Sequence, residues 1–151
     1  MPAVAVPVKA APKAPRCGGE RLMRPEGGRY TCTFEDDFSG RSLDLSKWLV
    51  QDTSLSGFSA GAAGCYVDRP ANVSQSGGVL RLTSRKEAAP FWCALPWGGG
   101  YVTDRTAATI ASHTKFTQTY GRFEFRAKFP FSQGSSISTS STPRRMCAAR
   151  V

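Results

Sequence analysis

The sequence predicts an all-β fold, an antiparallel sandwich, and three features support this prediction. Residues 120–130 alternate apolar and charged side chains over nearly the whole segment. Short segments rich in β-branched residues follow one another, separated by Gly and Pro. No segment carries the apolar stripe of an amphipathic helix. Repeated short strands without helices favour two packed antiparallel sheets.

Three of the predicted strands lie in the middle of the chain. The segment 79–84 (VLRLTS) follows a pair of glycines and places Leu80 and Leu82 on one face. The segment 101–103 follows three glycines, and the segment 108–117 alternates and is rich in β-branched residues. Each is bounded by turn-forming residues, as short strands in a sandwich usually are.

The segment 120–130 (YGRFEFRAKFP) gives the clearest strand prediction. Its period of two sorts the side chains into an apolar face and a charged face, namely Phe123, Phe125, Ala127 and Phe129 against Arg122, Glu124, Arg126 and Lys128. The apolar face requires a covering layer, most simply a second sheet. The charged face is either solvated, with Glu124 in a salt-bridged ladder, or lines a cleft.

Composition divides the chain into three predicted parts. Residues 1–30 form an Ala/Pro-rich, basic lead-in or linker. Residues 31–131 hold the predicted strands. Residues 132–151 form an aberrant tail with eight Ser/Thr residues, three arginines and neither strand nor helix periodicity.

The net charge is +9, from 20 basic and 11 acidic residues, and its distribution along the chain argues against a nucleic-acid partner. The excess lies mainly at the two ends, because residues 1–29 hold six basic and two acidic residues and residues 132–151 hold three arginines and no acid. A nucleic-acid interface requires basic residues gathered on a folded face. Solvated ends are therefore the favoured interpretation.

The five cysteines predict structural disulfides and no metal site. None belongs to a Cys-x-x-Cys pair, and His113 is the single histidine, which argues against bound zinc. Wide spacing in a loop-rich β chain is typical of disulfides formed in an oxidising compartment. We predict Cys17–Cys32 and Cys65–Cys93, with Cys147 left over. Connectivity is not readable from sequence, and buried free thiols are the alternative.

The sequence also argues against a membrane partner. It contains no run of 18 apolar residues, which a membrane-spanning helix requires. Residues 1–16 do not read as a signal peptide, because prolines interrupt the apolar stretch and the lysines follow it.

Three segments in order resemble the opening half of glycoside hydrolase family 16, the laminarinase and lichenase type. They are FEDDFSGRSLDLSKW (34–48), NVSQSGGVLRLTS (72–84) and ATIASHTKFTQTYGRFEFRAKFP (108–130). The resemblance covers about residues 31–131. It implies an incomplete concanavalin A-like β-sandwich (jelly roll) that acts on β-glucan or a related polysaccharide, is secreted, needs no cofactor and is monomeric if it folds.

The resemblance also suggests where substrate would bind. Tyr66 and Asn72 match positions near the family's cleft-lining strands, and Arg126 lies on the charged face of segment 120–130. Trp92 and Trp97 lie in the segment PFWCALPWGGG, read as a loop that offers stacking faces to sugar rings. The alternative for both tryptophans is packing within the loop beside Cys93. Phe34, Phe38 and Trp48 are expected as core anchors.

The family's catalytic motif is missing from the chain, so no catalytic residue is predicted. Retaining glycosidases use two carboxylates, which this family carries on one strand as Glu-x-Asp-x-x-Glu or Glu-x-Asp-x-Glu. The sequence contains neither spacing, and no Asp or Glu follows Glu124. Glu35 and Asp37 belong to the family's opening turn and are poor substitutes. We therefore expect a chain truncated before its catalytic carboxylates, inactive as it stands, with open sheet edges that favour aggregation. A non-catalytic carbohydrate-binding module is the alternative function.

Overall fold

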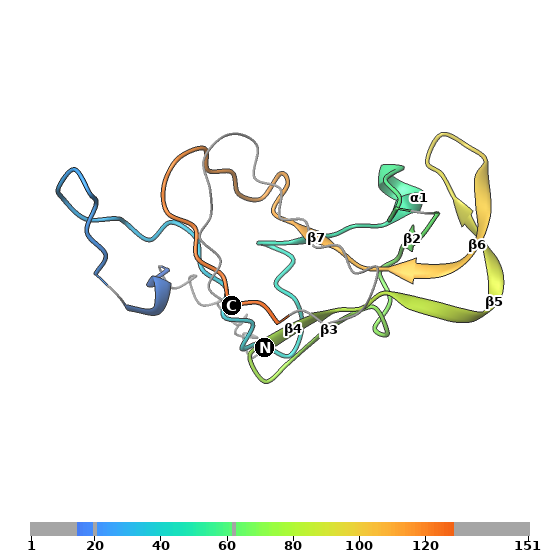
Figure 1. The fold of residues 1–151 in the computed structure, drawn as a ribbon, viewed down its shortest axis with the longest axis horizontal. Helices are drawn as coiled ribbons and strands as arrows, with labels where there is room; N and C mark the ends of the chain where they lie inside the picture. The colour runs from blue at the N-terminus through green and yellow to red at the C-terminus, as the bar shows by residue number, and fades with distance from the viewer. Residues whose placement is uncertain (1–14, 20, 62, 129–151) are drawn as a thin grey trace, which may run out of the picture. The chain divides into compact units, whose positions relative to one another are not determined.

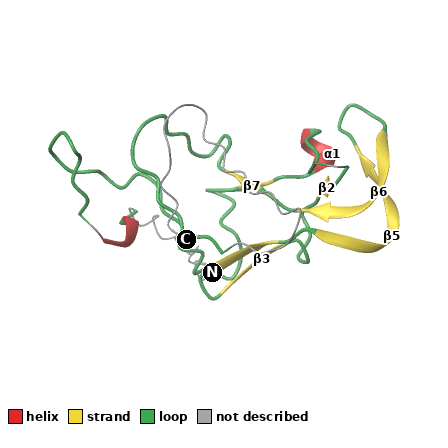
Figure 2. Cartoon of the chain, viewed as in Figure 1, coloured by secondary structure: helices red, strands yellow, loops and turns green. Residues whose placement is uncertain are grey.

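The structure is a computed structural model that describes residues 15–19, 21–61 and 63–128. The chain divides into two compact units, residues 1–35 and 36–151. The predicted tail at 132–151, with Cys147, lies outside the described residues. The all-β fold class is confirmed, because among the described residues strands dominate and helix is confined to two single turns (Figure 2).

The first unit is a small loop closed by the predicted disulfide between Cys17 and Cys32. A 3-10 turn spans Cys17–Gly19, and an antiparallel bridge joins Met23 to Arg29 further along. The Arg24 N–H donates to the Gly28 carbonyl, and two glycines with positive φ complete the turn between them. The unit therefore has a fixed hairpin register inside its disulfide.

The described part of the second unit contains seven strands in three small sheets (Figure 1). One two-stranded sheet pairs β1 (Leu49–Val50) with β7 (Ile110–Ala111), and a second pairs β3 (Val73–Ser76) with β4 (Val79–Leu82). The three-stranded sheet has the order β2 (Cys65–Tyr66), β6 (Gly100–Ala107), β5 (Arg85–Ala94). Every pairing is antiparallel except β2 with β6. This agrees with the antiparallel sandwich predicted for the chain.

The β5–β6 hairpin is the longest element and carries the core. Cys93 pairs with Tyr101 and Trp92 with Val102, and the register shifts between Lys86 and Phe91. Pro90 lies inside this irregularity, where its missing N–H removes one hydrogen bond from the ladder. The strand β5 was not predicted from the sequence, because its first half does not alternate.

Two strand predictions are wrong for the described residues. Within the segment 108–117 the strand β7 covers only Ile110–Ala111, and a turn follows in which the Lys115 N–H donates to the Ser112 carbonyl. Residues 120–128 form no strand, although Phe123 and Ala127 are less exposed than their neighbours. Alternating apolar and charged side chains favour a strand, but a strand also requires a neighbouring strand to complete its backbone hydrogen bonds.

The buried core is small and partly polar. A cluster of Cys65, Val67 and Cys93 is joined by the half-buried rings of Phe91 and Tyr101, and the predicted disulfide joins the two cysteines. The largest fully buried side chains are Asn72, Thr53, Thr106 and Cys93. Hydrogen bonds and one disulfide therefore hold this unit together more than apolar volume does.

The expected core anchors lie outside that cluster. The Phe38 and Trp48 rings stack with centroids 6.0 Å apart, and both side chains are only half-buried. The Trp48 indole N–H donates to Asp36 Oδ2 at 2.7 Å, and Asp44 caps the turn ahead of Lys47. This region is a separate, ring-stacked corner of the unit.

Candidate functional site

The turn that joins β5 to β6 presents Trp97 to solvent. The Gly98 N–H donates to the Leu95 carbonyl at 3.2 Å, and the Leu95 N–H donates to the Gly99 carbonyl at 3.1 Å. Pro96 restricts the backbone at the start of this turn, and the glycines supply the positive φ angles that close it. Trp97 remains 71% exposed on this tightly hydrogen-bonded turn.

The Trp97 indole packs against the end of a short helix. Helix α1 (Thr53–Ser56) starts at the N-cap Asp52, whose carboxylate accepts from the Ser54 N–H at 2.8 Å. It ends at Gly57 in the left-handed conformation (φ 75°). A Cβ at Gly57 would lie 2.1 Å from Trp97 Cη2, so the indole lies directly on this glycine.

Two further apolar side chains, close to Gly57 along the chain, are well exposed. Leu55 on α1 is 80% exposed and Phe58, which follows Gly57, is 69% exposed. We call Leu55, Phe58 and Trp97 the tip surface. Trp97 was proposed from the sequence, whereas Leu55 and Phe58, which flank Gly57 along the chain, were not.

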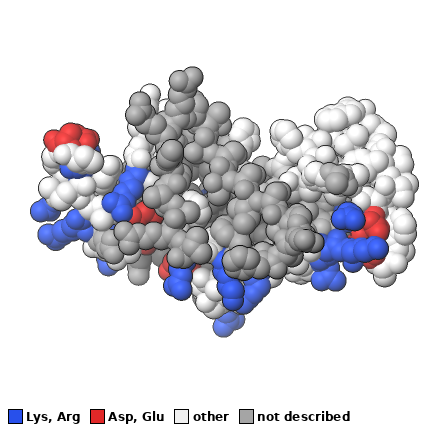
Figure 3. Space-filling model, viewed as in Figure 1, with Lys and Arg blue, Asp and Glu red and all other residues white. Residues whose placement is uncertain are grey.

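The tip surface carries no charge. The chain has no Asp, Glu, Lys or Arg in residues 53–67 or in residues 88–103, the two stretches that build it. Figure 3 shows the same absence over α1 and the end of the β5–β6 hairpin, with charged side chains gathered lower on that side. These uncharged stretches are the sequence signal that would have located the surface.

Trp92 lies on β5 and not in the loop predicted for it. It alternates with the buried Cys93, so its indole projects from the opposite face of the strand. It lies across Gly100, where a Cβ would be 2.9 Å from the indole, and it is 59% exposed beside Val102. The structure therefore places Trp97 against α1 and Trp92 on the outer face of the hairpin.

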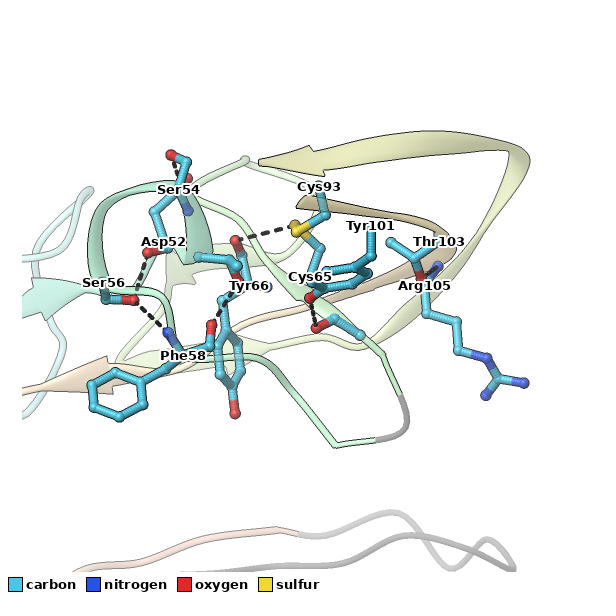
Figure 4. Close-up of a disulfide and its surroundings, with 12 residues drawn as sticks. Asp52, Ser54, Ser56, Phe58, Cys65, Tyr66, Cys93, Tyr101, Thr103 and Arg105 are labelled. Atoms are coloured by element: carbon cyan, nitrogen blue, oxygen red, sulfur yellow. Dashed lines mark hydrogen bonds between the residues drawn. A yellow bond between two sulfur atoms is a disulfide. The ribbon is translucent and has the colours of Figure 1, made fainter. Parts of the chain in front are cut away.

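The other predicted contact residues are dispersed. Tyr66 on β2 is half-buried, and Figure 4 shows its ring and that of Phe58 directed away from the Cys65–Cys93 disulfide. The Tyr66 N–H donates at 2.9 Å to Thr53 Oγ1, which ties β2 to α1. Arg126 is exposed in a segment without strand structure.

Asn72 is fully buried and acts as a structural centre. Its Nδ2 donates to the Thr83 carbonyl and to Thr106 Oγ1, both at 3.0 Å, and the Thr106 hydroxyl donates to Glu87 Oε1 at 2.6 Å. With no exposed surface, Asn72 neither touches a sugar directly nor accepts a glycan at its Asn-Val-Ser sequon in the folded chain. Its connection to a binding site is through the loops it holds.

The described carboxylates do not form a catalytic pair at the tip surface. Glu124 pairs with Arg122, which confirms part of the predicted ladder, and Asp104 pairs with Lys86. Hydrogen bonds from the Ser39 hydroxyl and N–H lower the pKa of the exposed Asp37 carboxyl, which keeps it ionised. Within residues 15–19, 21–61 and 63–128, no three His, Cys, Asp or Glu residues are placed to hold a metal ion. No helix in that part of the chain is long and apolar enough to cross a membrane.

Substitution of Gly57 by alanine tests the seat of Trp97. The added methyl would overlap the indole and would strain a backbone with positive φ. We expect G57A to lose about 1–2 kcal/mol of stability and to shift tryptophan fluorescence as the indole is displaced. A G77A variant is the control, since Gly77 also has positive φ but open space at its Cβ. Unchanged fluorescence in G57A would contradict this packing.

Comparison with known proteins relates the chain to a β-glucanase. It is 27% identical over 108 residues to the glucan endo-1,3-beta-glucosidase A1 of Niallia circulans, an alignment that covers 67% of this chain and 15% of that protein. The chain thus spans a small part of the length of its relative. No family model matches the sequence, and no solved structure matches it. The chain is therefore a distant, partial relative of a protein named for action on β-1,3-glucan.

Proposed function

We propose that the chain is a secreted glycoside hydrolase family 16-like protein that binds a β-1,3-glucan-type polysaccharide through the tip surface. The observation that carries this proposal is Trp97, held on Gly57 and 71% exposed, next to a chain segment in which Leu55 and Phe58 are also exposed. An exposed indole on a rigid turn offers a flat apolar face, and sugar rings stack on such faces through their C–H groups. Limited side-chain freedom reduces the entropy lost on binding.

The lack of charge supports a neutral sugar polymer as the ligand. Residues 53–67 and 88–103 contribute no ionised group, and the nearest carboxylate along the chain is Asp52 at the N-cap of α1. A neutral glucan needs no charged partner on such a surface. The relationship to a protein named glucan endo-1,3-beta-glucosidase points to the same polymer class. Two disulfides are consistent with an extracellular protein.

Binding without hydrolysis is the form of this function that the residues favour. The 151 residues contain no Glu-x-Asp-x-x-Glu or Glu-x-Asp-x-Glu spacing, which the family uses for its nucleophile and acid–base pair. The alternative is that this chain is one part of a hydrolase whose carboxylates lie elsewhere, since it aligns with only 15% of its relative. In both cases the tip surface serves to hold polysaccharide.

Substitution of Trp97 by alanine tests the proposal. We expect W97A to weaken binding of a soluble β-1,3-glucan at least about tenfold, close to 1.4 kcal/mol, because the stacking face is lost. Tyr120→Ala is the matched control, since Tyr120 is an aromatic residue with 83% exposure outside the tip surface. Titration calorimetry gives the affinity, and an assay for new reducing ends tests for hydrolysis.

The result for Trp92 defines the extent of the binding surface. Loss of affinity in W92A as well as W97A would place sugar on both sides of the hairpin, whereas loss in W97A alone would confine it to the tip surface. Equal affinity of W97A and the unmodified chain would overturn the proposal. Release of reducing ends by the unmodified chain would show that this chain catalyses hydrolysis.

A further inference from the structure

The first unit carries basic side chains on a folded, disulfide-closed hairpin. Arg16, Arg21, Arg24 and Arg29 are all exposed, and Figure 3 shows basic atoms along this hairpin with acidic atoms at its turn. The disulfide joins residues 15 apart in sequence, and the Met23–Arg29 bridge fixes the register between them. These arginines are therefore held at set positions, unlike charges in a solvated tail.

The hairpin register separates Arg29 from Arg24. Met23 and Arg29 are paired across the bridge, so their side chains share one face, and the exposed Arg21 precedes Met23 by two residues. Arg24 belongs to the other face, where its guanidinium lies 5.8 Å from the centre of the Tyr30 ring. Two exposed arginines thus lie at the Met23 bridge, Arg29 directly opposite Met23 and Arg21 two residues before it, and Met23 is itself 59% exposed.

The described carboxylates do not neutralise these two arginines. All ion pairs among the described residues lie in the second unit. Glu35 accepts from the backbone N–H groups of Arg16 and Gly18, which directs its carboxylate to the base of the loop. Arg21 and Arg29 are therefore available to an external anion.

We propose that Arg21 and Arg29 bind an acidic polysaccharide, a polymer that carries carboxylate or sulfate groups. Guanidinium groups bind such oxyanions through paired N–H donors, and a fixed pair of them favours a ligand with repeated charges. Disulfides place the chain in an oxidising compartment, where polymers with repeated negative charge are largely polysaccharides. This interaction is independent of the neutral tip surface.

The test compares two charge-matched variants of the full chain. R21Q/R29Q is expected to weaken binding of polygalacturonate on the order of tenfold, as two exposed charge-assisted contacts are lost. The control R41Q/R81Q removes the same charge from exposed residues of the second unit and should bind nearly as well as the unmodified chain. Equal loss in both variants would show attraction by net charge alone and would overturn the proposal.

Two further measurements separate the remaining explanations. C17S/C32S should weaken polygalacturonate binding to a similar extent, because the arginines lose their fixed spacing; unchanged binding would overturn a folded site. Duplex DNA should bind more weakly than polygalacturonate at the same salt concentration, and tighter DNA binding would overturn the choice of polysaccharide. Binding of neutral β-1,3-glucan should be the same in R21Q/R29Q, so failure here is distinguishable from failure of the proposed function.

Discussion

Removal of the Cys65–Cys93 disulfide is expected to lower the free energy of unfolding of the second unit by about 3–4 kcal/mol. The disulfide closes a loop with a sequence separation of 28, which restricts the unfolded chain. Its two cysteines also form half of the buried apolar residues, with Cys93 1% and Cys65 5% exposed. Because the core is small, no large apolar cluster among the described residues compensates for the loss.

The double variant C65A/C93A measures this effect, with alanine chosen to avoid burying two hydroxyl groups. Urea unfolding followed by tryptophan fluorescence reports on the second unit, where all three tryptophans lie. C17A/C32A is the matched control, since it opens the other disulfide and should leave this transition nearly unchanged. A shift below about 1 kcal/mol in C65A/C93A would show that the hydrogen-bonded threonines and Asn72 hold the unit without the disulfide.

Features of the fold that depend on neighbouring residues were easier to predict from the sequence than features that depend on residues far apart in the chain. The strand β4 follows from a few neighbouring residues, and it was predicted. The proposed disulfide pairs Cys17–Cys32 and Cys65–Cys93 are confirmed, although connectivity itself is not readable from sequence. The segment 120–128 alternates as strongly as any part of the chain, yet no partner strand lies beside it in the described residues. Alternation reports a local preference, whereas pairing depends on residues far away.

The candidate site likewise combines a residue that was proposed from the sequence with a contact that was not. Trp97 was predicted because tryptophan beside Pro and Gly is conspicuous in sequence. Its seat on Gly57 was not, since this contact joins residues 40 positions apart through the turn of α1. Asn72 was proposed as a sugar contact through family resemblance, but burial is a property of the folded chain that a single polar residue does not reveal.

Substitution of Asn72 by aspartate is expected to destabilise the second unit by about 3–5 kcal/mol at neutral pH. The amide donates to the Thr83 carbonyl and to Thr106 Oγ1, and an ionised carboxylate has no hydrogen to offer either acceptor. Asn72 is 0% exposed, so the new charge would be buried close to the Glu87 carboxylate that accepts from Thr106.

The stability lost in N72D should increase as pH rises, because the new carboxyl group is buried. Burial and a nearby carboxylate raise the pKa of the new carboxyl in the folded state above its unfolded value of about 4. Below that unfolded value the carboxyl is protonated in both states, and the variant is then at its most stable relative to the unmodified chain. As pH rises from about 4 through the raised folded pKa, the unfolded state releases its proton first and the variant loses stability.

N72A is the control that separates lost hydrogen bonds from buried charge. It removes the same two donors without adding a carboxylate, so its cost of about 1–3 kcal/mol should be the same at both ends of the pH range. The measurement is urea unfolding of the unmodified chain, N72A and N72D at about pH 4 and pH 8. Parallel pH dependence of N72A and N72D would mean that position 72 admits water in the folded chain. A gap that widens with pH would instead establish Asn72 as a dry, hydrogen-bonded link between the β4–β5 corner and β6.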